Sequence, residues 1–235
     1  MAIKPILFDK QISTEMVRAI LDGRKCCTRR INKDANDYVV PDMDFYDSDK
    51  RTYAVHNYAD KEHTDKLSIA ERICPICPGD ILWVRETWCL RYDGEKYFYK
   101  ADKNTPREEK QLIDYDHTSW KPSIHMPKEA ARIWLKVTDV RVERLQDIDE
   151  DGVWNEGFRF TPPCLTIVSA DGHTCDLDGP CESHVKYCDM TMGELFGREL
   201  WDKTIKKPDI DRYGWDASPW VWVIEFERCE KPEGV

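Results

Sequence analysis

The sequence predicts an α+β fold, in which a small, curved mixed sheet or barrel carries packed helices and two irregular insertions. Three observations indicate this class. Strand-like segments with alternating or continuous apolar residues recur along the chain. Segments with helical apolar spacing or helix caps lie between them. Two polar stretches, residues 32–70 and 158–190, show neither pattern. A chain of 235 residues suits one large domain with sizeable insertions, so we expect a single domain over residues 1–235.

The first predicted elements are a short strand at residues 4–8 and an amphipathic helix that follows it. Ser13 or Thr14 can cap this helix, because a side-chain oxygen at that position accepts from backbone N–H groups. Gly23 supplies the left-handed residue that commonly ends a helix. The polar, weakly periodic residues 32–70 then predict a long loop or insertion with one hairpin. A structureless loop of this length is uncommon, so we expect the segment to be either functional or ordered by contacts with the rest of the chain.

Four later segments predict strands. A Pro-Gly-Asp turn at residues 78–80 precedes a strand at 81–84, and a strand at 97–101 lies close enough to form a hairpin with it. Residues 133–142 alternate between apolar and polar, which predicts one long strand or two. The run at 220–226 is nearly all apolar, so we expect a closing strand with both faces covered.

Two further helices are predicted from their termini. Residues 147–156 form a short helix with acidic residues in its first turn and Gly157 after its end. Thr191 and Glu194 form a capping box that opens a helix running to about residue 205. The stretch 120–127 contains two prolines and is therefore expected to be an extended connector.

A dense group of basic residues follows the first helix. The basic segment, Gly23 to Arg30, carries four of the chain's 35 basic residues in eight positions. The whole chain is acidic, with a formal net charge of −10 and a pI near 5.2. This contrast indicates a site for one anion or polar ligand, and it excludes a general nucleic-acid coat, which needs basic surface over a wide face.

The sequence also indicates in which cellular compartment the protein acts. The chain contains no run that approaches the roughly 18 apolar residues of a membrane span, and its N-terminus has no signal-peptide pattern. We therefore expect a cytoplasmic protein with no membrane partner. In the cytoplasm, the ten cysteines are expected to be reduced thiols or metal ligands rather than disulfides.

Four motifs occur in a characteristic order along the chain: EMVRAILDGRK at 15–25, LWVRETW at 82–88, PSIHMP at 122–127 and PWVWVIEF at 219–226. This ordered set resembles the ASCH domain, a PUA-like mixed β-barrel, and is most similar to the larger ASCH proteins of bacteriophages and prophages. The resemblance covers most of the chain outside the two insertions. It implies a cleft for a nucleoside, nucleobase or RNA, and a location in the host cytoplasm.

One small bacterial branch of the ASCH family hydrolyses N4-acetylcytidine to cytidine with a lysine, a threonine and a glutamate. The resemblance places the first two at Lys25 and Thr28, within the Gly-Arg-Lys-x-x-Thr motif. It places the glutamate near the end of the acidic helix, where Glu156 is the best match. Glu86 is the rival carboxylate, and both remain candidates at this point.

The chemistry can be argued from these residue types. Amide hydrolysis needs a nucleophile, a base that activates it and an acid for the leaving amine. Thr28 offers a hydroxyl, and Lys25 can accept its proton only as a neutral amine, which like charges in the basic segment favour. Glu156 can hold the lysine or pass a proton to the leaving nitrogen. Residues three apart on a regular strand face opposite sides, so Lys25 and Thr28 converge only if the chain bends or bulges.

Other interpretations of the same residues stay open. The basic segment can be a solvated edge, with Thr28 an ordinary strand residue. The cleft can also bind RNA or a modified base without turnover, or the protein can be a phage accessory factor that acts through protein contacts. Trp120 lies in the extended connector and can reach a cleft to stack on a base. The predicted ligand-contacting residues are Arg24, Arg29, Arg30, Glu86 and Trp120.

The proposed hydrolysis requires no cofactor, but a structural zinc ion is possible on cysteine spacing. Cys74 and Cys77 lie in a C-x-x-C pair of the zinc-knuckle type. A second pair would come from the later insertion, where Cys181 and Cys188 are the first choice. The alternatives there are Cys164, Cys175, His173 and His184. The competing interpretation is that these are free cysteines and that the prolines shape the turn before the next strand.

Overall fold

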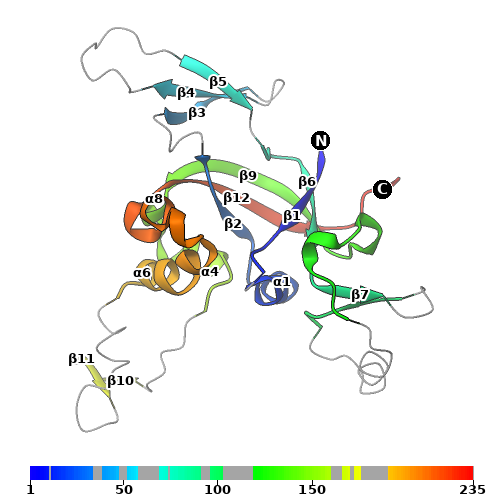
Figure 1. The fold of residues 1–235 in the computed structure, drawn as a ribbon. Coiled ribbons are helices and arrows are strands. Elements are labelled where there is room, and N and C mark those ends of the chain that lie inside the picture. The colour runs from blue at the N-terminus through cyan, green and yellow to red at the C-terminus, as the bar shows by residue number, and fades with distance from the viewer. Residues whose placement is uncertain are drawn as a thin grey trace.

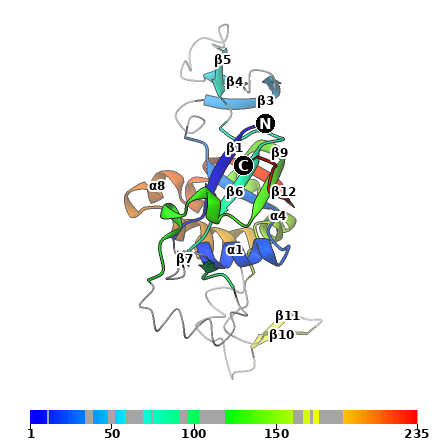
Figure 2. The same cartoon turned by 90° about the vertical axis from the view of Figure 1, so that its right-hand side faces the viewer.

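The structure, a computed structural model, is built on a five-stranded sheet of strand order β1-β6-β9-β12-β2 (Figures 1 and 2). It describes residues 1–10, 12–33, 39–47, 52–57, 69–73, 75–90, 96–102, 119–159, 166–169, 172–175 and 190–234. The five strands are β1 (Ile3–Leu7), β2 (Cys27–Ile31), β6 (Ile81–Arg85), β9 (Trp134–Arg144) and β12 (Trp220–Cys229). β1 and β6 pair in parallel and the other pairs are antiparallel. This mixed sheet with packed helices confirms the predicted α+β class.

The inner strand β12, which lies between β9 and β2, is buried on both faces, as its apolar run predicted. Val221 and Val223 face one apolar cluster, which also holds residues of the C-terminal helices. Trp222, Ile224 and Phe226 face the other cluster, which includes the helix α1 (Ser13–Leu21). Because side chains alternate across a strand, this one segment anchors a helical layer on each face of the sheet.

The helical layers are short. α4 (Glu150–Asn155) is capped by the preceding Asp149, whose side chain accepts from the Gly152 N–H at 2.7 Å. The predicted capping box is present at the start of α6 (Met192–Phe196), which continues into a π-helical turn, η4 (Gly197–Trp201). The other helical elements among the residues that the structure describes are η1 (Ser123–His125), η2 (Lys128–Ala130), η3 (Leu145–Asp147), α7 (Asp202–Thr204), η5 (Lys207–Asp209), α8 (Ile210–Tyr213) and η6 (Trp215–Ala217).

The cap of α1 differs from the prediction. Its N-cap residue is Ile12, without a side-chain hydrogen bond, and Ser13 is already the first helical residue. The Ser13 hydroxyl is buried without a hydrogen-bond partner among the described residues. The buried Ser13 hydroxyl therefore does not cap the helix, contrary to the prediction. The prediction for Gly23 is confirmed, since its φ is 72°.

The predicted hairpin between 81–84 and 97–101 is wrong. β6 pairs with β1 and β9 instead, while β8 (Tyr97–Tyr99) pairs with β7 (Trp88–Leu90). The buried Asp80 accepts from the backbone N–H of Ala2 at 2.8 Å and from the Lys4 amine at 3.3 Å. These bonds hold the N-terminal strand β1 beside β6. The apolar residues 81–84 of β6 then lie inside the sheet, where both of its faces can be covered.

The two insertions contain more regular structure than expected. β3 (Val39–Asp47), β4 (Thr52–Asn57) and β5 (Ile69–Ile73) form a separate antiparallel sheet (Figure 1). In the second insertion β10 (Thr166–Ser169) pairs with β11 (Gly172–Cys175). Aspartate and proline in β3 hid its strand character, because both residues are uncommon in strands. Across the residues that the structure describes, none of the helices is long and apolar enough to cross a membrane.

Gly197 is expected to be essential for packing of the C-terminal helical layer. A Cβ atom there would lie 2.2 Å from Cδ2 of the buried Trp215 ring. We expect Gly197→Ala to lower the free energy of unfolding by about 1–3 kcal/mol or more, because the ring must move. Gly193→Ala is the matched control, since its Cβ would lie 3.4 Å from the same ring. Equal losses in urea denaturation of the two variants would contradict this account.

Candidate active site at the edge of the sheet

Two glycines bring the basic segment against the end of α4. Gly23 turns the chain after α1, and Lys25 then forms an isolated antiparallel bridge with Glu156. Gly157 follows with a φ of 78°. A Cβ at Gly157 would lie 2.8 Å from the Ala19 Cβ and 2.9 Å from the Lys25 Cβ. Only glycine permits this approach, so the backbone itself positions Lys25 beside Glu156.

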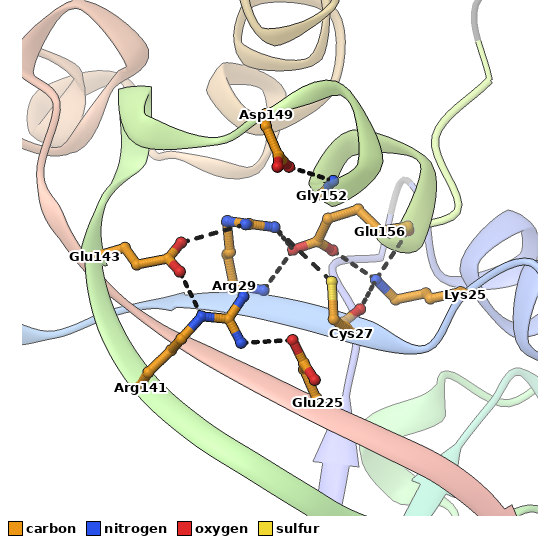
Figure 3. Close-up of polar contacts among 9 residues, drawn as sticks. All are labelled: Lys25, Cys27, Arg29, Arg141, Glu143, Asp149, Gly152, Glu156 and Glu225. Carbon is orange, nitrogen blue, oxygen red and sulfur yellow. Dashed lines mark hydrogen bonds and ion pairs between the residues drawn. The ribbon is translucent and has the colours of Figure 1, made fainter. Parts of the chain in front are cut away.

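Lys25 and Glu156 form a buried ion pair (Figure 3). The Lys25 Nζ donates to Glu156 Oε2 at 2.6 Å, and the two side chains are 1% and 4% exposed. The same nitrogen also donates to the carbonyl oxygens of Cys27, at 2.7 Å, and Glu156, at 3.0 Å. Three acceptors match the three N–H groups of an ammonium ion, so the resting arrangement holds Lys25 in its charged form.

The second carboxylate oxygen of Glu156 binds Arg29. Glu156 Oε1 accepts from the Arg29 backbone N–H at 2.6 Å and lies 3.4 Å from the Arg29 Nη1. β2 is an end strand of the sheet, so its outward N–H groups need acceptors other than a neighbouring strand. Glu156 supplies one, and its carboxylate lies at the sheet edge between two buried cations.

Two adjoining hollows lie beside this pair. The inner chamber, about 70 Å³, is lined by Lys25, Thr28 and Glu156, among others. The outer cleft, about 460 Å³, is walled in part by the connector residues Pro122 to Ile124. Both hollows are bounded by Phe8, Asp9, Arg29, Arg30, Trp201 and Thr204. Because they share these walls, the outer cleft lies next to the chamber that holds the buried pair.

The outer cleft lies between the two end strands of the sheet. Arg30, on β2, donates from Nη2 to the carbonyl oxygen of Leu7, at the end of β1, at 2.6 Å. Its guanidinium carbon lies 5.4 Å from the centre of the Phe8 ring. Burial lowers the pKa of Arg30, and the charge of Glu156 opposes this effect. Arg30 thus links the two end strands of the sheet, β2 and β1, next to both hollows.

Thr28 and Lys25 both reach the inner chamber, although they are three positions apart. Lys25 precedes β2, which begins at Cys27, so the alternation of a regular strand does not govern the two residues. Thr28 lies within β2 opposite Ile224 and is 4% exposed. The predicted trio of Lys25, Thr28 and Glu156 is therefore brought together around one small chamber.

The rival carboxylate Glu86 has different partners. Both of its oxygens accept from Arg132, each at 2.9 Å, and Arg132 also pairs with Asp102 at 2.7 Å. Burial raises the pKa of Glu86, and Arg132 opposes that rise. Glu86 is absent from the described residues that line the two hollows. Its carboxylate instead holds Arg132, which in turn contacts Asp102 and the Tyr99 ring of β8.

Two further predicted contacts lie outside the hollows. Arg24 donates to the carbonyl of Gly157 and to Asp22, each at 3.2 Å. Trp120 is 37% exposed in the connector, while its neighbours Pro122 to Ile124 line the outer cleft. Sequence reasoning missed Phe8 and Trp201, which line both hollows. Phe8 follows the first strand and Trp201 lies in a C-terminal helical turn. A single aromatic residue at such a position has the same sequence pattern whether it lines a cleft or packs in the core.

The comparisons with known proteins give one similarity. No protein-family model and no curated protein matches the chain. Among solved structures, the chain is similar to the crystal structure of an ASCH domain from Lactobacillus crispatus JV V101, at 10% sequence identity and a TM-score of 0.36. The aligned region covers 97% of this chain and 79% of that one. A similarity of this size does not place the chain in a family.

The predicted zinc site falls mostly outside the described residues. Cys74, Cys181 and Cys188 lie there, as do the alternatives Cys164 and His184. Cys77 is described and is 1% exposed within the apolar cluster around α1. Within the described ranges, no group of three or more histidine, cysteine or acidic side chains could hold a metal ion. The zinc site therefore stays a prediction.

The two cysteines of the basic segment differ in burial. Cys26 is exposed, whereas Cys27 is buried. Burial, followed by the charge of Glu156, raises the pKa of the Cys27 thiol to about 12. Because this value lies above the ordinary 9.0, the folded chain retains the proton longer than the unfolded chain. The stabilisation from Cys27 is present below about pH 9 and is lost as the pH rises toward 12.

We expect Cys26 to react with iodoacetamide at pH 8 while Cys27 in the native protein does not. The thiolate is the reactive form, and Cys27 is both buried and protonated at this pH. Peptide mass spectrometry distinguishes the sites, with the Cys26→Ser variant as a control for assignment. Equal labelling rates at the two positions would show that the start of β2 opens to solvent.

Proposed function

We propose that this protein is a nucleobase-directed protein of the ASCH, PUA-like type that removes the acyl group from an N4-acylated cytidine. The observation that carries the proposal is the 2.6 Å contact between Lys25 Nζ and Glu156 Oε2 beside a chamber that Thr28 also lines. A hydroxyl, an amine and a carboxyl group around one chamber supply the nucleophile, base and acid that amide hydrolysis needs. The ordered sequence motifs support the same activity.

The two hollows suit the two parts of such a substrate. The inner chamber is small, about 70 Å³, and suits a short acyl group next to Thr28. The outer cleft, about 460 Å³, has room for the base and sugar. Phe8 and Trp201 offer aromatic faces where the hollows adjoin, and stacking on such faces is a common way to bind a base.

The proposed reaction begins with a proton shift within the buried pair. Lys25 passes a proton across the 2.6 Å contact to Glu156, which leaves an amine beside a carboxylic acid. The Thr28 oxygen then attacks the acyl carbon while its proton passes to the Lys25 amine. As the bond between that carbon and N4 breaks, Glu156 gives its proton to N4, and cytidine leaves.

The second half of the reaction restores the site. The acyl group is then esterified to Thr28, Lys25 is an ammonium and Glu156 is a carboxylate. A water molecule attacks the ester carbon and passes a proton to Glu156. As the ester bond breaks and the carboxylic acid is released, the Thr28 oxygen takes its proton back from the Lys25 ammonium. Glu156 finally returns its proton to the Lys25 amine across their contact, and the ion pair is re-formed.

A second function is favoured by one specific observation. Three protein acceptors already satisfy the three N–H groups of Lys25, an arrangement suited to a structural ammonium. In this alternative the same cleft binds a modified nucleoside or RNA without turnover. Binding needs the aromatic and cationic walls of the outer cleft, and it does not need the hydroxyl of Thr28.

The deciding experiment is incubation of the purified protein with N4-acetylcytidine, with cytidine and acetate followed by chromatography. We expect cytidine and acetate to form in equal amounts with turnover. Calorimetric titration of N4-acetylcytidine is run in parallel on the folded protein. Binding without turnover would replace the hydrolase with the binding module, and neither binding nor turnover would overturn both functions.

A further inference from the structure

A row of alternating charges extends from Lys25 and Glu156 across the neighbouring strands (Figure 3). The Arg29 guanidinium lies 3.4 Å from Glu156 Oε1 through Nη1 and 3.5 Å from Glu143 Oε2 through Nη2. Glu143 in turn pairs with Arg141, which also pairs with Glu225. The row in order is Lys25, Glu156, Arg29, Glu143, Arg141 and Glu225.

The strand register explains this row. Arg29 on β2 and Arg141 on β9 are both opposite Val223 of β12, one on each side. Residues directly opposite in adjacent strands share a face of the sheet, as do residues two apart on one strand. Glu143 and Glu225 therefore lie on the same face as the two arginines. The row runs from side chains that are at most 4% exposed to Glu225, which is 42% exposed.

Arg29 is divided between two carboxylates. Its guanidinium lies at almost the same distance from Glu156 and Glu143, and its Nε is buried without a partner among the described residues. α4 leaves space for this group, because a Cβ at Gly152 would lie 3.0 Å from the Arg29 Nη2. Glu156 Oε1 lies 2.6 Å from the Arg29 backbone nitrogen but 3.4 Å from the Arg29 Nη1. The guanidinium is therefore the weaker of the two Arg29 contacts with this oxygen.

The charge count shows what Glu143 contributes. The two cations that contact the Glu156 carboxylate, Lys25 and Arg29, carry two buried positive charges against its one negative charge. Glu143 balances the second cation. If Glu143 were removed, the guanidinium of Arg29 would interact with Glu156 as its remaining carboxylate partner in this row. Its charge would then stabilise the ionised form of Glu156 and oppose proton transfer from Lys25.

We propose that Glu143 is a positioning residue that holds the Arg29 guanidinium partly away from Glu156, so that Glu156 can take a proton from Lys25. The inference rests on the proposed function, since this proton transfer begins the proposed hydrolysis. Other charged or titratable groups face the Lys25–Glu156 pair from the elements packed around it. None of these groups is changed in the variants described below. They are Asp9 after β1, Cys26 before β2, Cys27 and Arg30 on β2 and Asp149 on α4.

The test compares Glu143→Gln with Glu143→Asp and Glu225→Gln. Glu143→Gln removes one negative charge with little change in size, so we expect kcat/KM for N4-acetylcytidine to fall roughly tenfold or more. Both limbs of the pH–rate profile should move to lower pH, because loss of a nearby negative charge favours the deprotonated form of each group. Glu143→Asp keeps the charge and should restore most of the rate. Glu225→Gln, at the exposed end of the row, should leave the profile in place.

A second readout does not depend on turnover. The NMR signal of the Glu156 carboxyl carbon, assigned with Glu156→Gln, is followed over pH in the wild-type protein and in Glu143→Gln. We expect the Glu156 transition to move to lower pH in Glu143→Gln and to stay in place in Glu225→Gln. An unchanged transition in a folded Glu143→Gln protein would overturn the positioning role, whatever its rate. A shifted transition without turnover in the wild-type protein would refute the hydrolase alone.

Discussion

Replacement of Thr28 by valine is expected to lower kcat/KM for N4-acetylcytidine by about 10³-fold or more, because it removes the proposed nucleophile. Valine has nearly the same shape as threonine and also favours a strand, so β2 should stay paired with β12. Thr28 is 4% exposed and lines the inner chamber, where the methyl group of valine fits the space of the hydroxyl. The dissociation constant for N4-acetylcytidine should therefore stay near the wild-type value.

Thr204→Val is the matched control for this prediction. Thr204 lines both hollows, but its hydroxyl donates to the carbonyl oxygen of Trp201 at 2.8 Å. Loss of that hydroxyl should cost binding or stability without removing the nucleophile. Steady-state kinetics and calorimetric titration of the two variants separate the effects. Turnover by Thr28→Val close to the wild-type rate would exclude a threonine nucleophile.

Local sequence signals predicted the elements that hold the site. The capping box of α6, the left-handed Gly23 and the strand β12 with two covered faces all follow from short patterns. Strand partners did not follow from such patterns. The hairpin predicted for 81–84 failed because β6 is placed by Asp80 and by the N-terminal strand, which are distant from 97–101 in sequence.

The choice between Glu156 and Glu86 shows the same limit within the site. Both glutamates are buried, and both lie beside predicted elements. Their partners differ because the close approach at Gly157 brings Glu156 to Lys25, whereas Arg132 binds Glu86. Trp201 was missed for a related reason. It reaches the hollows because η4 packs in the apolar cluster with Val221 and Val223 of β12, and no pattern near residue 201 indicates that packing.

Glu156→Ala is expected to be the most destabilising single change at the site. It would leave the Lys25 ammonium, whose side chain is 1% exposed, without the carboxylate that neutralises it, and it would remove one of the two carboxylates that contact Arg29. Removal of one partner from a buried ion pair commonly costs about 3–5 kcal/mol of the free energy of unfolding. Glu225→Ala is the control, because its side chain is 42% exposed and exposed pairs contribute about 0–1 kcal/mol. Equal effects in urea denaturation would contradict a buried charge at Glu156.

A double variant separates stability from chemistry at this pair. Replacement of both Lys25 and Glu156 by methionine removes the cation together with the anion, so it should recover part of the stability lost in Glu156→Ala. Arg29 keeps Glu143 as its partner in that variant, which limits the remaining imbalance of charge. We expect the double variant to fold and to hydrolyse no N4-acetylcytidine. That result would show that apolar residues can hold the start of β2 against α4. It would also show that the ion pair is required for chemistry and not only for stability. Turnover by the folded double variant would instead show that the pair has only a structural role.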